Sequence, residues 1–274
     1  MVSGDSDSDE ARASLGKFAK RYAVAAGGAF YAFTLGVGDA KNRHLIQQIA
    51  RRFGHREGDA PRLPRVGIDV ITSSSTSVVL PEPIAKDGNV SLLELLVLSR
   101  LVRERRPGRI FEIGTFDGRT TLALAMNSAD DAHVYTLDLP AATPTALSIE
   151  RSERAFVEKS ASGSRFHGTN VEAKITQLFG DSARFDFSPY TVDLVFVDAS
   201  HAYEYVLNDS IRALDMLGDS RGLVVWHDYS EWPGVTRALD ELAATDSRFA
   251  DLKWIEGTTL AVLDRSTSRP GLSS

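Results

Sequence analysis

The hydrophobic pattern divides the chain into two parts of different regularity. Over residues 11–53, apolar side chains recur with helical spacing, interrupted near 36–39. Residues 54–64 are rich in glycine, proline and charge, which is typical of a linker or a surface loop. The pattern therefore predicts helices before residue 54. The β-branched, serine-interrupted stretch 66–80 favours no single element, and its role stays open.

From residue 91 onward, apolar runs alternate with helical patterns. The leucine-rich stretch 91–101 begins with Ser91 and Glu94, which have the spacing of a capping box, and predicts a helix that ends before Pro107. Apolar runs predict strands at 109–113, 133–137, 165–168, 192–197 and 222–226. Helical periodicity predicts helices at 120–126, 148–159, 171–179, 203–217 and 235–244. The end of the chain, LKWIEG followed by TTLAVLD, predicts two strands joined at Glu256-Gly257.

This alternation predicts the fold class. Strand–helix repeats favour an α/β, Rossmann-like, doubly wound and mostly parallel seven-stranded sheet, and the final hairpin adds antiparallel strands at its end. We divide the chain into a disordered acidic tail (1–10), a mainly helical N-terminal extension (11–90), the sheet domain (91–265) and a flexible tail (266–274). The extension is expected to form a lid or a subunit contact, and hence a homo-oligomer.

Composition narrows the classes of function. The 274 residues are 43% hydrophobic and 25% charged, the usual soluble mixture, and the absence of cysteine excludes disulfides and thiolate chemistry. The net charge of −6 argues against nucleic acid as a partner, because phosphate binding requires a basic surface. No apolar run reaches the roughly 20 residues that span a bilayer. We therefore expect no stable membrane insertion and a cytoplasmic location.

The end of the first strand of the sheet domain carries the first candidate site. It reads FEIGTFDGRTT, with Glu112, Gly114 and Gly118 ahead of a helix. Gly114 allows a sharp turn and a close ligand approach, and the free N–H groups at the helix start favour a polar or anionic group. The same two glycines are equally typical of a tight strand–helix turn without a ligand.

Polar residues also stand at the ends of later strands. Asp138 ends the second strand. A carboxylate at such a strand end can accept hydrogen bonds from both hydroxyls of a ribose. The alternative is that Asp138 is simply the aspartate of the turn before Pro140. Asp198 and His201 follow the fourth strand, and His227 and Asp228 end the fifth. Adjacent strand tips lie about 5 Å apart, so these four side chains are expected to converge. They suit Mg²⁺ or another divalent cation, or alternatively a hydrogen-bonded structural cluster.

Five motifs in this order, FEIGTFDGRTT, TLDLP, FGDSARF, VDLVFVDASHAY and GLVVWHDY, resemble the class I S-adenosylmethionine-dependent methyltransferases. Within that class the similarity is to the small-molecule O-methyltransferase branch, and it covers about residues 91–264. The resemblance implies S-adenosylmethionine as cofactor. The residues implied to contact the cofactor are Glu112, Gly114, Thr115 and Gly118 at its methionine end, Asp138 at the ribose, Leu139, Asp181 and Ser182 at the adenine, and Asp198.

The resemblance also implies a reaction, methyl transfer to a hydroxyl of a small-molecule acceptor. His201 would act as general base with Asp198 and His227 beside it, and a metal would bind Asp198, His227 and Asp228. Metal-dependent members of the branch carry acidic or amide side chains where this chain has His227. Tyr203, Tyr229 and Trp232 are candidates for the acceptor pocket wall.

Two other functions stay open. One is a non-catalytic, methyltransferase-like nucleotide-binding protein, and the other is an NAD-dependent oxidoreductase. The latter lacks the third glycine of GxGxxG.

Overall fold

The computed structural model describes residues 5–38, 46, 49–50, 58, 60–81, 88–149, 153, 157, 161–218 and 221–265. The chain falls into two compact units, Met1–Glu57 and Gly58–Ser274. The predicted flexible tail, 266–274, and most of the helix predicted at 148–159 lie outside the described residues.

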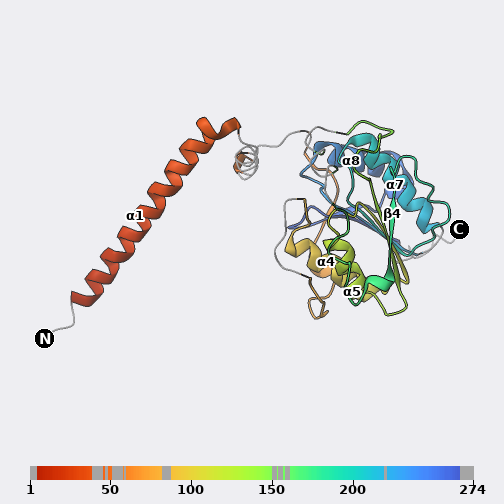
Figure 1. The fold of residues 1–274 in the computed structure, drawn as a ribbon, viewed down its shortest axis with the longest axis horizontal. Coiled ribbons are helices and arrows are strands. Elements are labelled where there is room, and N and C mark those ends of the chain that lie inside the picture. Colours follow the sequence, from red (N-terminus) through yellow and green to blue (C-terminus); the bar gives the residue numbers. More distant parts are fainter. Residues whose placement is uncertain are drawn as a thin grey trace. The chain divides into compact units, whose positions relative to one another are not determined.

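The first unit contains the helix α1 (Asp5–Phe33), followed by the 3-10 helix η1 (Leu35–Gly38) (Figure 1). The helix begins inside the acidic segment for which we predicted disorder. Large apolar side chains are exposed along it: Phe18, Tyr22, Val24, Phe30, Tyr31 and Phe33. Among the described helices, none is long and apolar enough to span a membrane. The role of lid or subunit contact stays a prediction.

The second unit is built on a mixed sheet of eight strands. Its strands are β1 (Arg65–Val66), β2 (Arg109–Ile113), β3 (His133–Asp138), β4 (Ile175–Phe179), β5 (Leu194–Val197), β6 (Leu223–Trp226), β7 (Lys253–Ile255) and β8 (Ala261–Asp264). Their order is β1-β7-β8-β6-β5-β2-β3-β4, and only β8 runs antiparallel to its neighbours. The order changes direction between β2 and β5. Ligands of such sheets bind beyond the carboxyl ends of the strands at this point.

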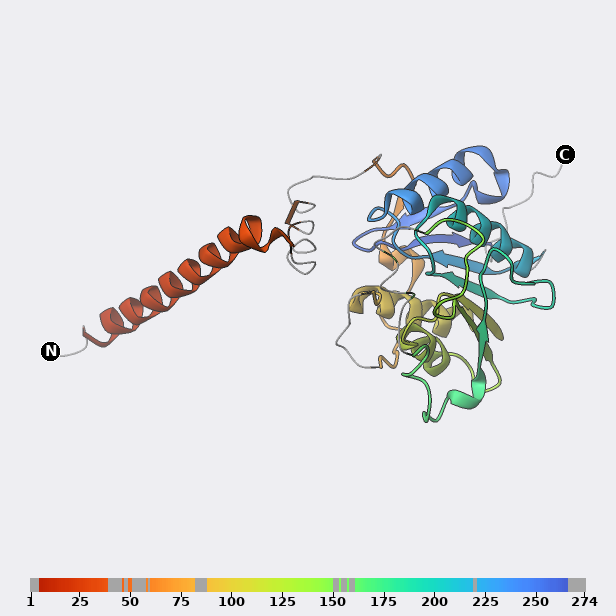
Figure 2. The same ribbon diagram turned by 45° about the horizontal axis from the view of Figure 1, so that its top comes forward.

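Helices cover both faces of the sheet (Figures 1 and 2). The helices of this unit are α3 (Ile68–Ile71), α4 (Leu92–Arg105), α5 (Arg119–Asn127), α7 (Tyr203–Leu217) and α8 (Pro233–Thr245), with short 3-10 helices at Glu172–Lys174 and Ser247–Phe249. α4 and α5 pack on the face that includes Ile110, and α7 and α8 pack on the face that includes Phe111. Successive strand residues therefore point to opposite cores, as expected for a sheet buried on both sides.

Two predicted elements are wrong. Instead of a helix at 171–179, only Glu172–Lys174 forms a 3-10 turn, and Ile175–Phe179 is strand β4, paired in parallel with β3. Tertiary pairing overrides a helical spacing that rests on few residues. The strand predicted at 165–168 is a turn, where Gly163 and Gly168 adopt positive φ angles that a strand does not accommodate.

The sheet also has one strand more than predicted. β1 lies in the stretch whose role stayed open and pairs in parallel with β7, Val66 opposite Ile255. Its length of two residues leaves no periodic signal in the sequence. Part of the segment 11–90 that we predicted as a helical extension therefore belongs to the sheet unit.

Candidate functional site

The turn between β2 and α5 depends on two glycines. Gly114 has a φ angle of +109°, and a Cβ atom there would lie 1.9 Å from the carbonyl oxygen of Asp198. Gly118 caps α5 with a φ angle of +86°, and a Cβ atom there would lie 2.7 Å from the ring of Phe166. Both positions therefore require glycine. At Gly114 the close approach is made by the main chain after β5, whereas the sequence had suggested a ligand.

Glu112 is buried beneath this turn. Its Oε2 atom accepts hydrogen bonds from the hydroxyl groups of Thr121 and Thr136, the latter at 2.6 Å. Burial raises the pKa of Glu112 to about 8, although both hydroxyl donors oppose the rise. The hydroxyl of Thr115 lies 2.7 Å from that of Thr136. The carboxyl group therefore connects β2, β3 and the start of α5, and its predicted contact with a cofactor stays a prediction.

Asp138 is the last residue of β3 and faces the glycine turn. The N–H of Phe116 donates to its Oδ1 atom at 3.4 Å, and only 6% of the residue is exposed. The N–H of Gly180, just before Asp181, donates to the carbonyl oxygen of Asp138 at 3.0 Å. The turns after β2, β3 and β4 therefore meet.

The residues predicted at an adenine are largely covered by the chain itself. The carboxylate of Asp181 accepts hydrogen bonds from the N–H of Ala146 at 2.6 Å and from the hydroxyl of Tyr205 at 2.9 Å. Ser182 is buried, and Leu139 is half-buried. Asp181 therefore fixes the loop after β4 against α7 and against the segment after β3.

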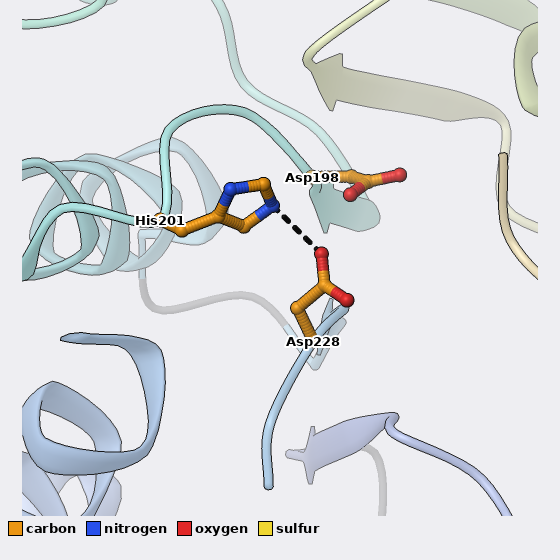
Figure 3. Close-up of side chains that lie close together, drawn as sticks. All are labelled: Asp198, His201 and Asp228. Atoms are coloured by element: carbon orange, nitrogen blue, oxygen red, sulfur yellow. Dashed lines mark hydrogen bonds and ion pairs between the residues drawn. The ribbon is translucent and has the colours of Figure 1, made fainter. Parts of the chain in front are cut away.

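Asp198, His201, His227 and Asp228 converge as predicted, and we call them the acid–histidine cluster. Figure 3 shows three of them, Asp198, His201 and Asp228. The Nε2 atom of His201 lies 2.7 Å from Oδ2 of Asp228. The Nδ1 atom of His227 lies 3.0 Å from Oδ1 of Asp198 and 3.1 Å from Oδ2 of Asp228. Asp228 adopts a left-handed φ angle of +65°, which turns its carboxylate back toward both imidazoles.

His201 is held on three sides. Its ring stacks on Trp232 with 4.1 Å between the ring centroids and 8° between the planes. Its Nδ1 atom lies 2.9 Å from Oε1 of Glu153, which also accepts a hydrogen bond from the N–H of His201. Burial by itself would lower the pKa of His201, but Asp228 and Glu153 raise it to about 10. His201 therefore carries a proton at neutral pH in this arrangement.

Both ring nitrogens of His227 lie close to carboxylates. Its Nε2 atom lies 3.3 Å from Oε2 of Glu94, and its Nδ1 atom faces Asp198 and Asp228. Burial lowers the pKa of His227, but the charges of Asp228 and Asp198 raise it well above its usual value. Burial likewise raises the pKa of Glu94, but His227 contributes most to lowering it to about 2.

Two of the three residues predicted as metal ligands, Asp198 and Asp228, lie close to a further candidate donor, His201. Asp198, His201 and Asp228 each offer one ligand atom, and these three atoms lie within 4.8 Å of one another. Two carboxylates and one imidazole fit Mn²⁺, Fe²⁺, Zn²⁺ or Mg²⁺. The Nδ1 atom of His227, which we predicted as a ligand, also lies close to both carboxylates, so its role as a ligand stays a prediction. Figure 3 shows His201 pointing toward Asp198 and Asp228.

The three aromatic residues predicted for a pocket wall separate. Trp232 lies on the ring of His201. The hydroxyl of Tyr203 donates to Glu241 and that of Tyr229 to Asp240, so both hydroxyls are paired with acidic residues of α8. Among the described ring contacts of these three residues, that of Trp232 is made to the acid–histidine cluster.

Two acidic residues of the site were missed from the sequence. Glu94 forms the predicted capping box with Ser91, and its carboxylate additionally reaches His227, 133 residues later. The capping spacing was a signal for the helix start but not for this contact. Glu153 lies in the stretch predicted as a helix, and nothing local indicates that it reaches His201, 48 residues away.

Comparison with known proteins finds similarity in the part of the chain that carries this arrangement. A family model described as a methyltransferase domain matches residues 111–229, from β2 to the residue after Asp228. The uncharacterized protein R132 of Acanthamoeba polyphaga mimivirus is 27% identical over 139 residues, which are 48% of this chain and 58% of that protein. This chain thus spans less than two thirds of the length of that relative.

Solved structures of similar fold are more distant. The methyltransferase PaMTH1 of Podospora anserina, solved with S-adenosylhomocysteine, is 20% identical over 64% of this chain and 79% of that one, with a TM-score of 0.46. The O-methyltransferase TomG of Streptomyces achromogenes, solved with S-adenosylmethionine, is 22% identical over 65% and 82%, with a TM-score of 0.47. Similarities at this level transfer no site residue and no substrate. The family match, which covers residues 111–229 and thus less than half of the chain, and the order of the sheet agree with the resemblance noted in the motifs.

Proposed function

We propose that this chain is an S-adenosylmethionine-dependent methyltransferase that acts on a hydroxyl group of a small molecule. The observation that carries the proposal is the meeting of Asp138 with the glycine turn, at the point where the strand order changes direction. The acid–histidine cluster lies at the carboxyl ends of β5 and β6, the next strands of the sheet after β2. It would provide acidic and basic groups beside the proposed cofactor site.

The cofactor would lie across the tips of β2, β3 and β4. Asp138 would accept the ribose hydroxyls, because a carboxylate at this strand end is the usual partner of a ribose. Leu139, Asp181 and Ser182 follow β3 and β4 and would contact the adenine. The turn from Gly114 to Gly118, with Thr115 in it, would receive the methionine end near the first N–H groups of α5.

When bound, S-adenosylmethionine supplies an activated methyl group on a sulfonium. The chain's own contribution is to align the acceptor oxygen and to remove its proton, since a neutral hydroxyl is a poor nucleophile. Asp198 and Asp228 provide the negative charge that attracts this proton. His201 gives up its own proton only at alkaline pH, because two carboxylates hold it.

Asp198, His201 and Asp228 would also hold a divalent cation, which when bound lowers the pKa of a coordinated hydroxyl. The donors fit such an ion, and the proton at Nε2 of His201 would then leave. Without the ion, His201 serves as the general base only above neutral pH. The role of His201 as base therefore has a clear signature, an activity that rises toward alkaline pH when metal is absent.

Calorimetry with S-adenosylmethionine and S-adenosylhomocysteine tests the proposal. We expect binding by the full chain, loss of binding in Asp138→Ala, and unchanged binding without turnover in His201→Ala. Asp215→Ala, at an exposed position near the end of α7, is the matched control and keeps both. No affinity for either compound would reject the proposal. Binding without methyl transfer to any hydroxylated acceptor would favour the non-catalytic alternative.

A further inference from the structure

Glu94 connects three elements that are distant in sequence. It is the third residue of α4, and only 4% of it is exposed. Its Oε2 atom accepts a hydrogen bond from the N–H of Ser91 at 2.8 Å and lies 3.3 Å from Nε2 of His227. Its Oε1 atom accepts two more from Thr259, from the N–H at 2.7 Å and from the hydroxyl at 2.8 Å. One carboxylate therefore joins α4, the end of β6 and the connection between β7 and β8.

The contacts of Glu94 lead on to the acid–histidine cluster by two routes. Through His227, the route reaches Asp198 and Asp228, which both lie about the Nδ1 atom of that ring. Through Thr259, the route reaches the main chain of Asp228, whose N–H donates to the threonine hydroxyl at 3.2 Å. Asp228, the residue with a left-handed backbone, is therefore fixed at both its side chain and its main chain.

From this geometry we propose that Glu94 is a positioning residue of the site. It holds the ring of His227 so that the Nδ1 side faces Asp198 and Asp228, and it keeps these two carboxylates directed toward His201. Without the carboxylate, the Nε2 side of the ring loses its partner in a buried environment, where an uncompensated charge is costly. The ring would then turn or shift, and Asp198 and Asp228 would lose their alignment.

Helix capping alone does not account for these contacts. Of the bonds made by the Glu94 carboxylate, the helix cap requires only the one that the N–H of Ser91 donates to Oε2. The other oxygen, Oε1, accepts its hydrogen bonds from Thr259. The two roles can also be separated by mutation. Ser91→Ala removes the hydrogen bond that the N–H of Glu94 donates to the hydroxyl of Ser91, but leaves the carboxylate of Glu94 on His227. Ser91 touches none of the four cluster residues among the described hydrogen bonds.

The test compares Glu94→Ala, Glu94→Gln and Ser91→Ala in the full chain, with three readouts. The ring ¹⁵N signals of His227, assigned by their loss in His227→Asn, report the surroundings of the imidazole. Calorimetry with S-adenosylhomocysteine reports cofactor binding, and methyl transfer reports turnover. The turnover readout rests on the proposed function, but the ring signals do not.

We expect Glu94→Ala to shift the His227 signals and to leave the affinity for S-adenosylhomocysteine unchanged. We expect kcat to fall by about 10- to 100-fold, which is the usual effect of removing the outer hydrogen-bond partner of a metal-ligating histidine. Glu94→Gln keeps an oxygen acceptor and is expected to restore part of kcat. Ser91→Ala should leave both the ring signals and kcat as in the wild type. If Glu94→Ala does not fold, a shifted His227 signal in folded Glu94→Gln supports the proposal.

Two results would overturn the proposal. One is a set of His227 signals that is identical in wild type, Glu94→Gln and any folded Glu94→Ala. The other is an equal loss of kcat in Ser91→Ala and Glu94→Ala, which would reduce Glu94 to a helix cap. A wild-type chain that binds no S-adenosylhomocysteine would refute the proposed function instead, and the ring signals would still decide the role of Glu94.

Discussion

Replacing Gly114 with alanine tests the architecture of the strand tips. The new methyl group would lie 1.9 Å from the carbonyl oxygen of Asp198 and 2.5 Å from its carbonyl carbon. Both atoms belong to the main chain, so no side-chain rotation relieves the contact. The substitution therefore pushes apart the ends of β2 and β5, between which the sheet changes direction.

The structure provides a control for the magnitude. Gly168 also has a positive φ angle, +74°, but a Cβ atom there would meet nothing within 4 Å. Gly168→Ala therefore carries only the backbone strain, about 1–3 kcal/mol. Gly114→Ala carries the same strain and an overpacking cost of about 1–3 kcal/mol more, so about 2–6 kcal/mol in total. Typical domains unfold with about 5–15 kcal/mol, so the larger loss is readily visible.

Urea unfolding of the two variants and the wild type, followed by circular dichroism, measures both losses. We expect Gly114→Ala to lower the free energy of unfolding by more than Gly168→Ala does, and to weaken binding of S-adenosylhomocysteine. Equal stability of the two variants would refute the reasoning, because it would mean that the main chain after β5 does not press on Gly114.

Three further predictions concern charge, acid–base chemistry and metal. Burial raises the pKa of Glu112 from 4.5 to about 8, so the contribution of this carboxyl group to the free energy of unfolding is complete below pH 4.5 and is lost as the pH rises toward 8. In urea titrations across that range, Glu112→Gln should therefore lose less stability with rising pH than the wild type does. An equal loss of stability with pH in both proteins would contradict the prediction. In metal-free protein, kcat should rise from pH 7 toward pH 10 as His201 loses its proton, and a flat profile would exclude this base. Prolonged EDTA treatment should lower turnover, and added Mn²⁺ should restore it. Full activity after EDTA treatment would refute a catalytic metal site at Asp198, His201 and Asp228.

The residues that were predictable from the sequence stand at the ends of strongly apolar strands. Asp138, Asp198 and Asp228 each follow a run whose burial is evident from composition, and parallel pairing then brings the tips together. The glycines at 114 and 118 were equally visible. The atom that requires Gly114, the carbonyl oxygen of Asp198, was not, since it belongs to the residue after β5, 84 positions later in the chain.

The missed features depend on contacts between distant segments. β4 is an edge strand whose partly buried residues carry a weak pattern, and its pairing with β3 decides its conformation. Glu94 and Glu153 enter the site from a helix start and from the region after β3, at separations that no spacing rule covers. The addition of His201 to the metal-ligand candidates has the same origin, because it depends on how the segments after β5 and β6 meet.

A crystal structure of the full chain with S-adenosylhomocysteine tests the central claim most directly. The account predicts both ribose hydroxyls within hydrogen-bonding distance of the Asp138 carboxylate, and the sulfur on the side of the acid–histidine cluster. A cofactor bound elsewhere, or a ribose held by another residue while Asp138 keeps to the N–H of Phe116, would contradict it.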